Sequence, residues 1–230
     1  MIDGVIFDKD GTLFDFRRSW GGWAEMLIGQ IAQDQAHATQ LAQAIGYDLH
    51  SGSFAPDSPV IAGTAQDVAQ ALVPHLPGQD ATGVADRINA AAAQAAMVPA
   101  VPLRPLLETL RAKGLRLGLA TNDTEVPARA HLAAHGLTDL FDFIAGYDSG
   151  HGAKPGPGMC LAFARQTGLD PARVAMVGDS LHDLHAGRAA GMVCIAVLTG
   201  IATQADLAPH ADVVLPDIGG IPQWLAGRAV

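Results

Sequence analysis

Cysteine is scarce in this chain, and long apolar runs are absent. The two cysteines, Cys160 and Cys194, lie far apart, with no CxxC or other metal-type spacing. We therefore expect neither a disulfide framework nor a zinc site, and two reduced cysteines suit a cytoplasmic protein. No stretch of 18 apolar residues and no signal-peptide pattern occurs, so no membrane partner is predicted.

Positive charge is sparse as well. Lysine and arginine together number 14, against 23 aspartates and glutamates, and the formal net charge is −9. The basic residues are scattered and form no patch of the kind that binds nucleic acid, so a nucleic-acid partner is not expected. Apolar residues, by contrast, fill 49% of the 230 positions. This is enough for a large core domain together with a smaller one.

Short apolar runs recur along the sequence. Such continuous runs are typical of strands covered on both faces, as in a parallel sheet. They occupy residues 4–7, 115–120, 143–145, 174–177, 193–197 and 213–215. Helical patterns that end at a glycine separate most of them, at residues 105–113, 125–135, 157–167 and 181–190. The alternation predicts an α/β fold with a doubly wound, Rossmann-like parallel sheet.

Residues 16–95 break this alternation. They show no convincing strand, only helical patterns at residues 20–33, 36–45, 64–73 and 82–96, with a loop over 48–59. We expect a small all-helical cap domain at 16–95, inserted into an α/β catalytic core formed by residues 1–15 and 96–230. Linkers are predicted near residues 15–18 and at 98–105, where three prolines cluster.

Polar side chains follow the ends of several predicted strands. In chain order they are Asp8, Asp10, Thr121, Asn122, Lys154, Asp179 and Asp183. Because the carboxyl ends of parallel strands meet at one edge of a sheet, we expect these residues to lie close together. Four carboxylates at one place need a cation, and Mg²⁺ is the hard ion that prefers oxygen ligands. Carboxylates, Mg²⁺, a lysine and a threonine together suit a phosphoryl group.

Four short segments carry these residues: FDKDGTL, ATND, AKPGPG and VGDSLHD, in this order. Together they resemble the four motifs of the haloacid dehalogenase superfamily, and the region of the last two is most similar to the phosphoglycolate phosphatase branch. The predicted cap lies directly after the first motif, where that superfamily carries a helical cap. The resemblance implies a phosphatase with a small phosphorylated metabolite as its substrate and Mg²⁺ as its cofactor.

The resemblance also implies roles for the matched residues. Asp8 would be the nucleophile that forms an aspartyl-phosphate, and Asp10 would protonate the leaving oxygen and then activate water. Thr121 and the backbone around Asn122 would bind phosphoryl oxygens. Gly11 would allow a tight backbone turn beside the phosphate.

In the same way, the resemblance implies how charge is balanced at the site. Lys154 would steady the nucleophile and the transferred phosphoryl charge. The metal would be held by Asp8, by the backbone carbonyl of Asp10 and by Asp179. Asp183 would act at the metal through water or by orienting Lys154.

Two residues inside these motifs carry a less specific signal. The alternation of side chains along a strand predicts that Lys9 points away from Asp8 and Asp10, either to the surface or toward the cap. Asp123 is expected to be a turn residue or to cap the helix that starts at Glu125.

The start of the predicted cap carries aromatic and basic residues. Trp20 and Trp23 are expected in the core of a helix. Arg17 and Arg18 could bind a carboxylate of the substrate, or could be solvated residues of a hinge. His182 lies beside Asp183, but a site for a hard cation does not favour imidazole, so we expect no metal ligand there.

A Mg²⁺-dependent phosphomonoester hydrolase is therefore the leading hypothesis, with phosphoglycolate favoured as the substrate by resemblance alone. The presence of Asp10 argues against a dehalogenase or a phosphonatase, and residues 16–95 contain no lysine for the Schiff base of a phosphonatase. A sugar-phosphate mutase, a nucleotide phosphatase and a catalytically inactive binding module remain as alternatives. The sequence does not indicate an oligomeric state.

Overall fold

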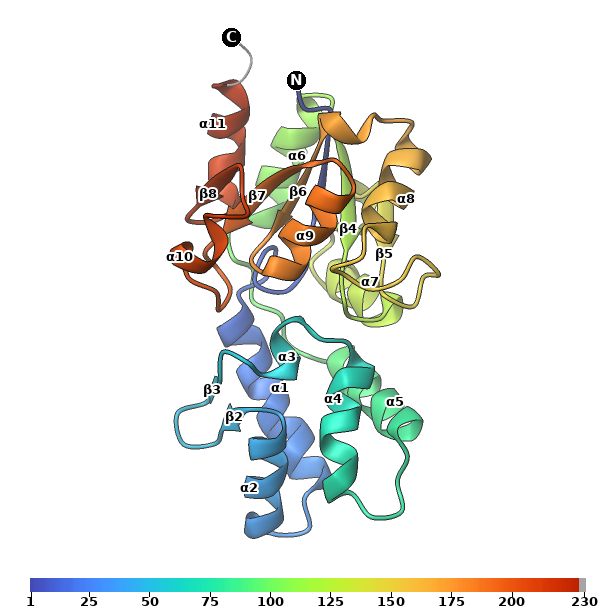
Figure 1. Cartoon of the computed structure of the whole chain (residues 1–230), viewed down its shortest axis with the longest axis vertical. Helices are drawn as coiled ribbons and strands as arrows, with labels where there is room; N and C mark the ends of the chain where they lie inside the picture. Colours follow the sequence, from blue (N-terminus) through green and yellow to red (C-terminus); the bar gives the residue numbers. More distant parts are fainter. Residues whose placement is uncertain (228–230) are drawn as a thin grey trace.

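A six-stranded parallel sheet forms the middle of the upper lobe of the computed structural model, which describes residues 1–227 (Figure 1). Its order is β5-β4-β1-β6-β7-β8. The strands are β1 (Gly4–Phe7), β4 (Arg116–Ala120), β5 (Phe143–Ala145), β6 (Val174–Gly178), β7 (Val193–Val197) and β8 (Val213–Leu215). All neighbours pair in parallel. The predicted parallel sheet is confirmed, with each strand within one residue of its expected bounds.

Helices cover both faces of this sheet. They are α6 (Leu103–Ala112), α7 (Glu125–Ala134), α8 (Gly158–Thr167), α9 (Leu181–Ala189), α10 (Gln204–Leu207) and α11 (Ile221–Ala226). Short 3-10 turns lie at Thr138–Leu140, Pro171–Arg173 and Ile218–Gly220. Alternate residues of β1 serve the two layers: Val5 and Phe7 share a core with α6, α7 and α11, whereas Ile6 packs with α8 and α9. The fold is therefore doubly wound, as predicted.

The cap is the lower lobe in Figure 1. It contains α1 (Phe16–Ile31), α2 (Gln35–Ala44), α3 (Pro59–Ala62), α4 (Ala65–Leu72) and α5 (Ala81–Ala92), with a 3-10 turn at Val73–His75. Side chains of Asp15, Asp34, Thr64 and Asp80 accept hydrogen bonds from the first turns of four of these helices. The hydrogen bond that the Asp15 side chain accepts as the N-cap of α1 explains why this helix starts four residues earlier than predicted.

The cap differs from the expectation in one respect, since it is not entirely helical. Within the predicted loop, β2 (Tyr47–Asp48) and β3 (Ser53–Phe54) form a small antiparallel ribbon. Each strand has two residues, which is too short to produce an alternating pattern in the sequence. The expected division of the chain at residues 15 and 96 remains a prediction, and residues 228–230 of the expected core lie outside the described part. Among the described helices, none is long and apolar enough to cross a bilayer.

The sheet register places the polar residues at one edge. Phe7, the last residue of β1, pairs with Leu119 of β4 on one side and with Val177 of β6 on the other. The residues that follow these three positions therefore leave the sheet side by side, facing the cap (Figure 1).

Candidate active site

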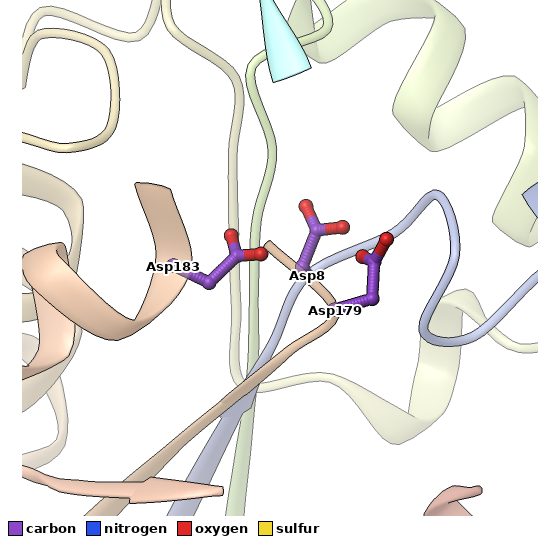
Figure 2. Close-up of side chains that lie close together, drawn as sticks. All are labelled: Asp8, Asp179 and Asp183. Carbon is purple, nitrogen blue, oxygen red and sulfur yellow. The ribbon is translucent and has the colours of Figure 1, made fainter. Parts of the chain in front are cut away.

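Three carboxylates converge where β1 and β6 end. Asp8 follows β1, Asp179 follows β6, and Asp183 lies in the first turn of α9, and Figure 2 shows their carboxylates near one another. One oxygen from each lies within 4.8 Å of the others. All three are buried, with exposed fractions of 7%, 3% and 1%. Buried carboxylates at such distances repel one another, so this cluster needs a compensating positive charge.

Lys154 supplies part of that charge. Its Nζ donates to Asp8 Oδ1 at 2.5 Å, to Asp183 Oδ1 at 2.6 Å and to the Ala120 carbonyl at 2.9 Å. The Asn122 side chain holds the backbone of Lys154 on both sides, because its Oδ1 accepts from the Lys154 N–H at 2.8 Å and its Nδ2 donates to the Lys154 carbonyl at 2.9 Å. The ammonium of Lys154 is thus held by groups at the ends of β1 and β4 and in the first turn of α9.

One ammonium does not neutralise three carboxylates. Burial raises the pKa of Asp8, Lys154 opposes this shift, and the neighbouring Asp183 and Asp10 add to it, so that the pKa is about 7. Burial and the neighbouring Asp8 and Asp183 raise the pKa of Asp179 well above its ordinary value. Burial alone would lower the pKa of Lys154, but Asp183 and Asp8 raise it. The remaining negative charge and the hard oxygen donors of Asp8, Asp179 and Asp183 fit a divalent cation such as Mg²⁺.

Two glycines allow the carboxylates to approach the backbone. Gly11 has a φ of +80°, and a Cβ at this position would lie 2.3 Å from Asp179 Oδ2. A Cβ on Gly178 would lie 2.2 Å from the Cβ of Asp183. A side chain at either position would therefore displace a member of the cluster.

Asp10 lies beside this cluster but directs its carboxylate elsewhere. Its Oδ2 is 2.7 Å from Lys9 Nζ, and its Oδ1 accepts from the Trp20 indole N–H at 2.8 Å. Thr121 and Asn122 follow β4 on the other side of the same pocket. All seven residues expected from the strand ends line this pocket, which encloses about 630 Å³, part of it open to solvent.

Comparisons with known proteins agree with this geometry. The model of the haloacid dehalogenase-like hydrolases matches residues 2–191. The chain belongs to this family. "Probable phosphatase IndB" of Dickeya dadantii is 39% identical over 222 residues, which cover 93% of this chain and 88% of that protein. The phosphoglycolate phosphatase of Yersinia pestis is 30% identical over 223 residues, covering 93% and 89%. The expected superfamily is confirmed.

A solved structure extends the likeness to the fold. The structure of CbbY from Rhodobacter sphaeroides in complex with phosphate superposes on this hydrolase with a TM-score of 0.71. The match covers 96% of each chain at 21% sequence identity. At this level of identity the comparison shows the shared fold, cap included.

The prediction that Lys9 points away from Asp10 is wrong in this hydrolase, but the alternative that it faces the cap holds, since its Nζ lies 5.2 Å from the centre of the Trp20 ring. The side chain of Lys9 is fully buried, and besides Asp10 its Nζ lies 3.3 Å from Asp123 Oδ2 and 3.1 Å from His131 Nδ1. The alternation of a strand does not extend to Lys9, because β1 ends at Phe7 and the chain then turns. Burial would lower the pKa of Lys9, but Asp10 and Asp123 raise it.

Asp123 lies in the bend before α7, as the turn alternative predicted, but it is not the N-cap of that helix. The residue that precedes α7 as its N-cap is Thr124, whose side chain makes no capping hydrogen bond, and the N–H of Glu125 donates instead to Asp148 Oδ1 at 2.9 Å. Asp123 instead pairs with Lys9, as described above, and burial raises the pKa of its carboxyl group. No signal in the sequence connects these two residues, which are far apart along the chain.

Residues of the cap and of α9 complete the pocket. Trp20 and Trp23 are buried in α1, as expected, but both also line the pocket. His182 lies in the lining too, and its Nδ1 is 3.1 Å from the carbonyl of Ala62 in α3. Asn122 Nδ2 donates to the same carbonyl at 2.9 Å. Two core side chains thus hold the end of α3 over the carboxylates.

Proposed function

We propose that this hydrolase is a Mg²⁺-dependent phosphatase that acts on small phosphomonoesters through an aspartyl-phosphate. The observation that carries the proposal is the setting of Asp8, whose carboxylate lies between Lys154 and two further carboxylates in the lining of a partly open pocket. A carboxylate so placed can attack a phosphoryl group, provided that positive charge offsets the negative charge of the substrate. The names of the two relatives above support the reaction class.

Asp8, Asp179 and Asp183, with the backbone carbonyl of Asp10, would hold Mg²⁺. When bound, the ion would neutralise charge on the phosphoryl oxygens. Lys154 fixes one oxygen of Asp8. This leaves the other oxygen of Asp8 to form the bond to phosphorus while the bond from phosphorus to the leaving oxygen breaks.

Asp10 is placed to move the proton. Its carboxylate lines the pocket beside Asp8, outside the cluster of three. We assign to it the donation of a proton to the leaving oxygen and, in the second step, the removal of a proton from the water that hydrolyses the aspartyl-phosphate. Lys9 and Trp20 hold the carboxylate in place from two sides.

The phosphoryl oxygens would be held by the residues that follow β4. Thr121 Oγ1 accepts from the Asp123 N–H at 3.0 Å, so its own hydrogen is free to donate to a phosphoryl oxygen. The side chain of Asn122 is occupied by Lys154 and Ala62, so its contribution would come from the backbone. Gly11 donates its N–H to the Phe14 carbonyl at 2.7 Å, so this N–H is not available to the phosphate. Gly11 instead leaves room for the carboxylate of Asp179, which a Cβ would displace.

The other hypotheses have less support. A sugar-phosphate mutase would use the same pair, Asp8 and Asp10, but it must retain and turn a bisphosphate, and no feature of the cap demands this. An inactive binding module would be expected to lack a residue of the cluster, and each expected residue is in place. Both cysteines are unpaired, which agrees with the expected cytoplasmic location.

Substitution of the nucleophile tests the mechanism. Asp8→Asn should abolish hydrolysis of p-nitrophenyl phosphate in the presence of Mg²⁺, and chelation of the metal should abolish the activity of the wild type. Asp86→Asn, which changes an exposed aspartate of α5, is the matched control and should retain activity. Substantial turnover by folded Asp8→Asn protein would overturn the proposed mechanism.

A further inference from the structure

The pocket wall opposite the carboxylates is apolar. It is built by the cap, and its apolar members include Trp23, Val60, Ile61, Val68, Ile88 and Ala92. These residues belong to α1, α3, α4 and α5, and in Figure 1 the cap that contains these helices faces the edge of the sheet at which β1 ends. Because the phosphoryl group must lie at Asp8, the leaving group of the substrate must lie against this wall.

The wall offers no counter-charge. Among the described lining residues, Lys154 is the one lysine or arginine, and its Nζ is held by Asp8, Asp183 and a carbonyl of the core. Arg17 and Arg18, which could have bound a carboxylate, are exposed and lie outside the described lining.

Two polar side chains beside the wall are already engaged within the protein. The Nδ1 of His182 faces the Ala62 carbonyl, and the indole N–H of Trp20 is bonded to Asp10. The buried indole N–H of Trp23 has no partner among the described residues, but one neutral donor does not balance a carboxylate. A carboxylate that is desolvated against such a wall loses its hydration without an ion pair in exchange.

We propose that this pocket selects phosphomonoesters whose leaving group is uncharged and presents an apolar face to Trp23, Ile61 and Val68. It discriminates against leaving groups that carry a carboxylate, phosphoglycolate included. The inference rests on the proposed phosphatase function and concerns the choice of substrate at the same site.

A pair of substrates that differ only in charge tests the proposal. Phosphoglycolate and its neutral amide share one skeleton, and we expect kcat/KM to be about tenfold or more higher for the amide. Phenyl phosphate should likewise exceed 4-carboxyphenyl phosphate, while the methyl ester of the latter should recover the activity. Equal or better turnover of phosphoglycolate would overturn the inference. Failure to hydrolyse any of these esters would instead count against the phosphatase function itself.

A variant of the wall provides the second test. Ile61→Lys places a cation in the wall, and its long stem can keep the ammonium hydrated at the partly open side. The ratio of kcat/KM for phosphoglycolate to that for the amide should rise several-fold in Ile61→Lys and not in Ile61→Met, the uncharged control of similar length. If Ile61→Lys does not fold, Val60→Lys replaces it. Identical ratios in the lysine and methionine variants would contradict the proposal.

Discussion

Trp20 and Asp10 are joined across the boundary between the cap and the core by a hydrogen bond of 2.8 Å from the indole Nε1 to the carboxylate. Trp20 belongs to α1 of the cap, whereas Asp10 follows β1 of the core. The carboxylate that we assign to proton transfer is therefore oriented by a cap residue. Its alignment depends on the cap remaining closed.

Loss of this bond should affect the protonation of the leaving group. In Trp20→Phe, we expect kcat/KM for an alkyl phosphate, a poor leaving group, to fall about tenfold, because a misaligned Asp10 donates its proton less well. The value for p-nitrophenyl phosphate should fall much less, because nitrophenolate leaves without a proton. Trp224→Phe, in α11 and outside the described lining of the pocket, is the matched control. An equal fall for both leaving groups would indicate a general loss of structure.

Lys9 should be a major contributor to stability. It is fully buried and faces Asp10 and Asp123, and its removal leaves two carboxylates without a cation. We expect Lys9→Met to lower the free energy of unfolding by roughly 3–5 kcal/mol. Urea unfolding at pH 7 measures the change. Lys113→Met, at an exposed position, should leave the unfolding midpoint unchanged, and equal midpoints for both variants would contradict the assignment.

His131 should make stability depend on pH. Burial, together with the nearby Lys9, lowers the pKa of His131 to about 4. The unfolded chain therefore takes up a proton near pH 6.5, where the folded protein does not, so stability is retained above this pH and lost as the pH falls toward 4. The contribution between pH 7 and pH 5 is about 2 kcal/mol.

A substitution isolates the effect of His131. We expect His131→Gln to be less stable than the wild type at pH 7, because it loses the contacts to Lys9 and to the Ala92 carbonyl. Its free energy of unfolding should nevertheless fall about 2 kcal/mol less than that of the wild type between pH 7 and pH 5. His185→Gln, at an exposed position of α9, should keep the wild-type pH dependence. Parallel pH profiles for His131→Gln and the wild type would rule the effect out.

The sequence predicts the sheet and the cluster of three carboxylates well, for a physical reason. Buried parallel strands require continuous apolar runs, and the residues after those runs are brought to one edge whatever the loops do. The contacts of Asp10 could not be predicted in this way. They depend on how the chain turns after Phe7 and on where the cap packs, and neither leaves a local pattern. The apolar wall could not be predicted either, because its residues come from four cap helices and are not placed at a regular interval along the sequence.

Alanine substitutions at Gly11 and Gly114 distinguish the effect of backbone strain from the effect of displacing a metal ligand. Both Gly11 and Gly114 have a positive φ, of +80° and +83°, but an added Cβ meets Asp179 only at Gly11, and meets nothing within 4 Å at Gly114. Gly114→Ala should therefore lose about 1–2 kcal/mol of stability and keep its activity. Gly11→Ala should lose at least as much stability and also displace Asp179. The Mg²⁺ concentration for half-maximal hydrolysis of p-nitrophenyl phosphate should rise about tenfold. A metal requirement equal to that of Gly114→Ala would show that Asp179 does not hold the ion.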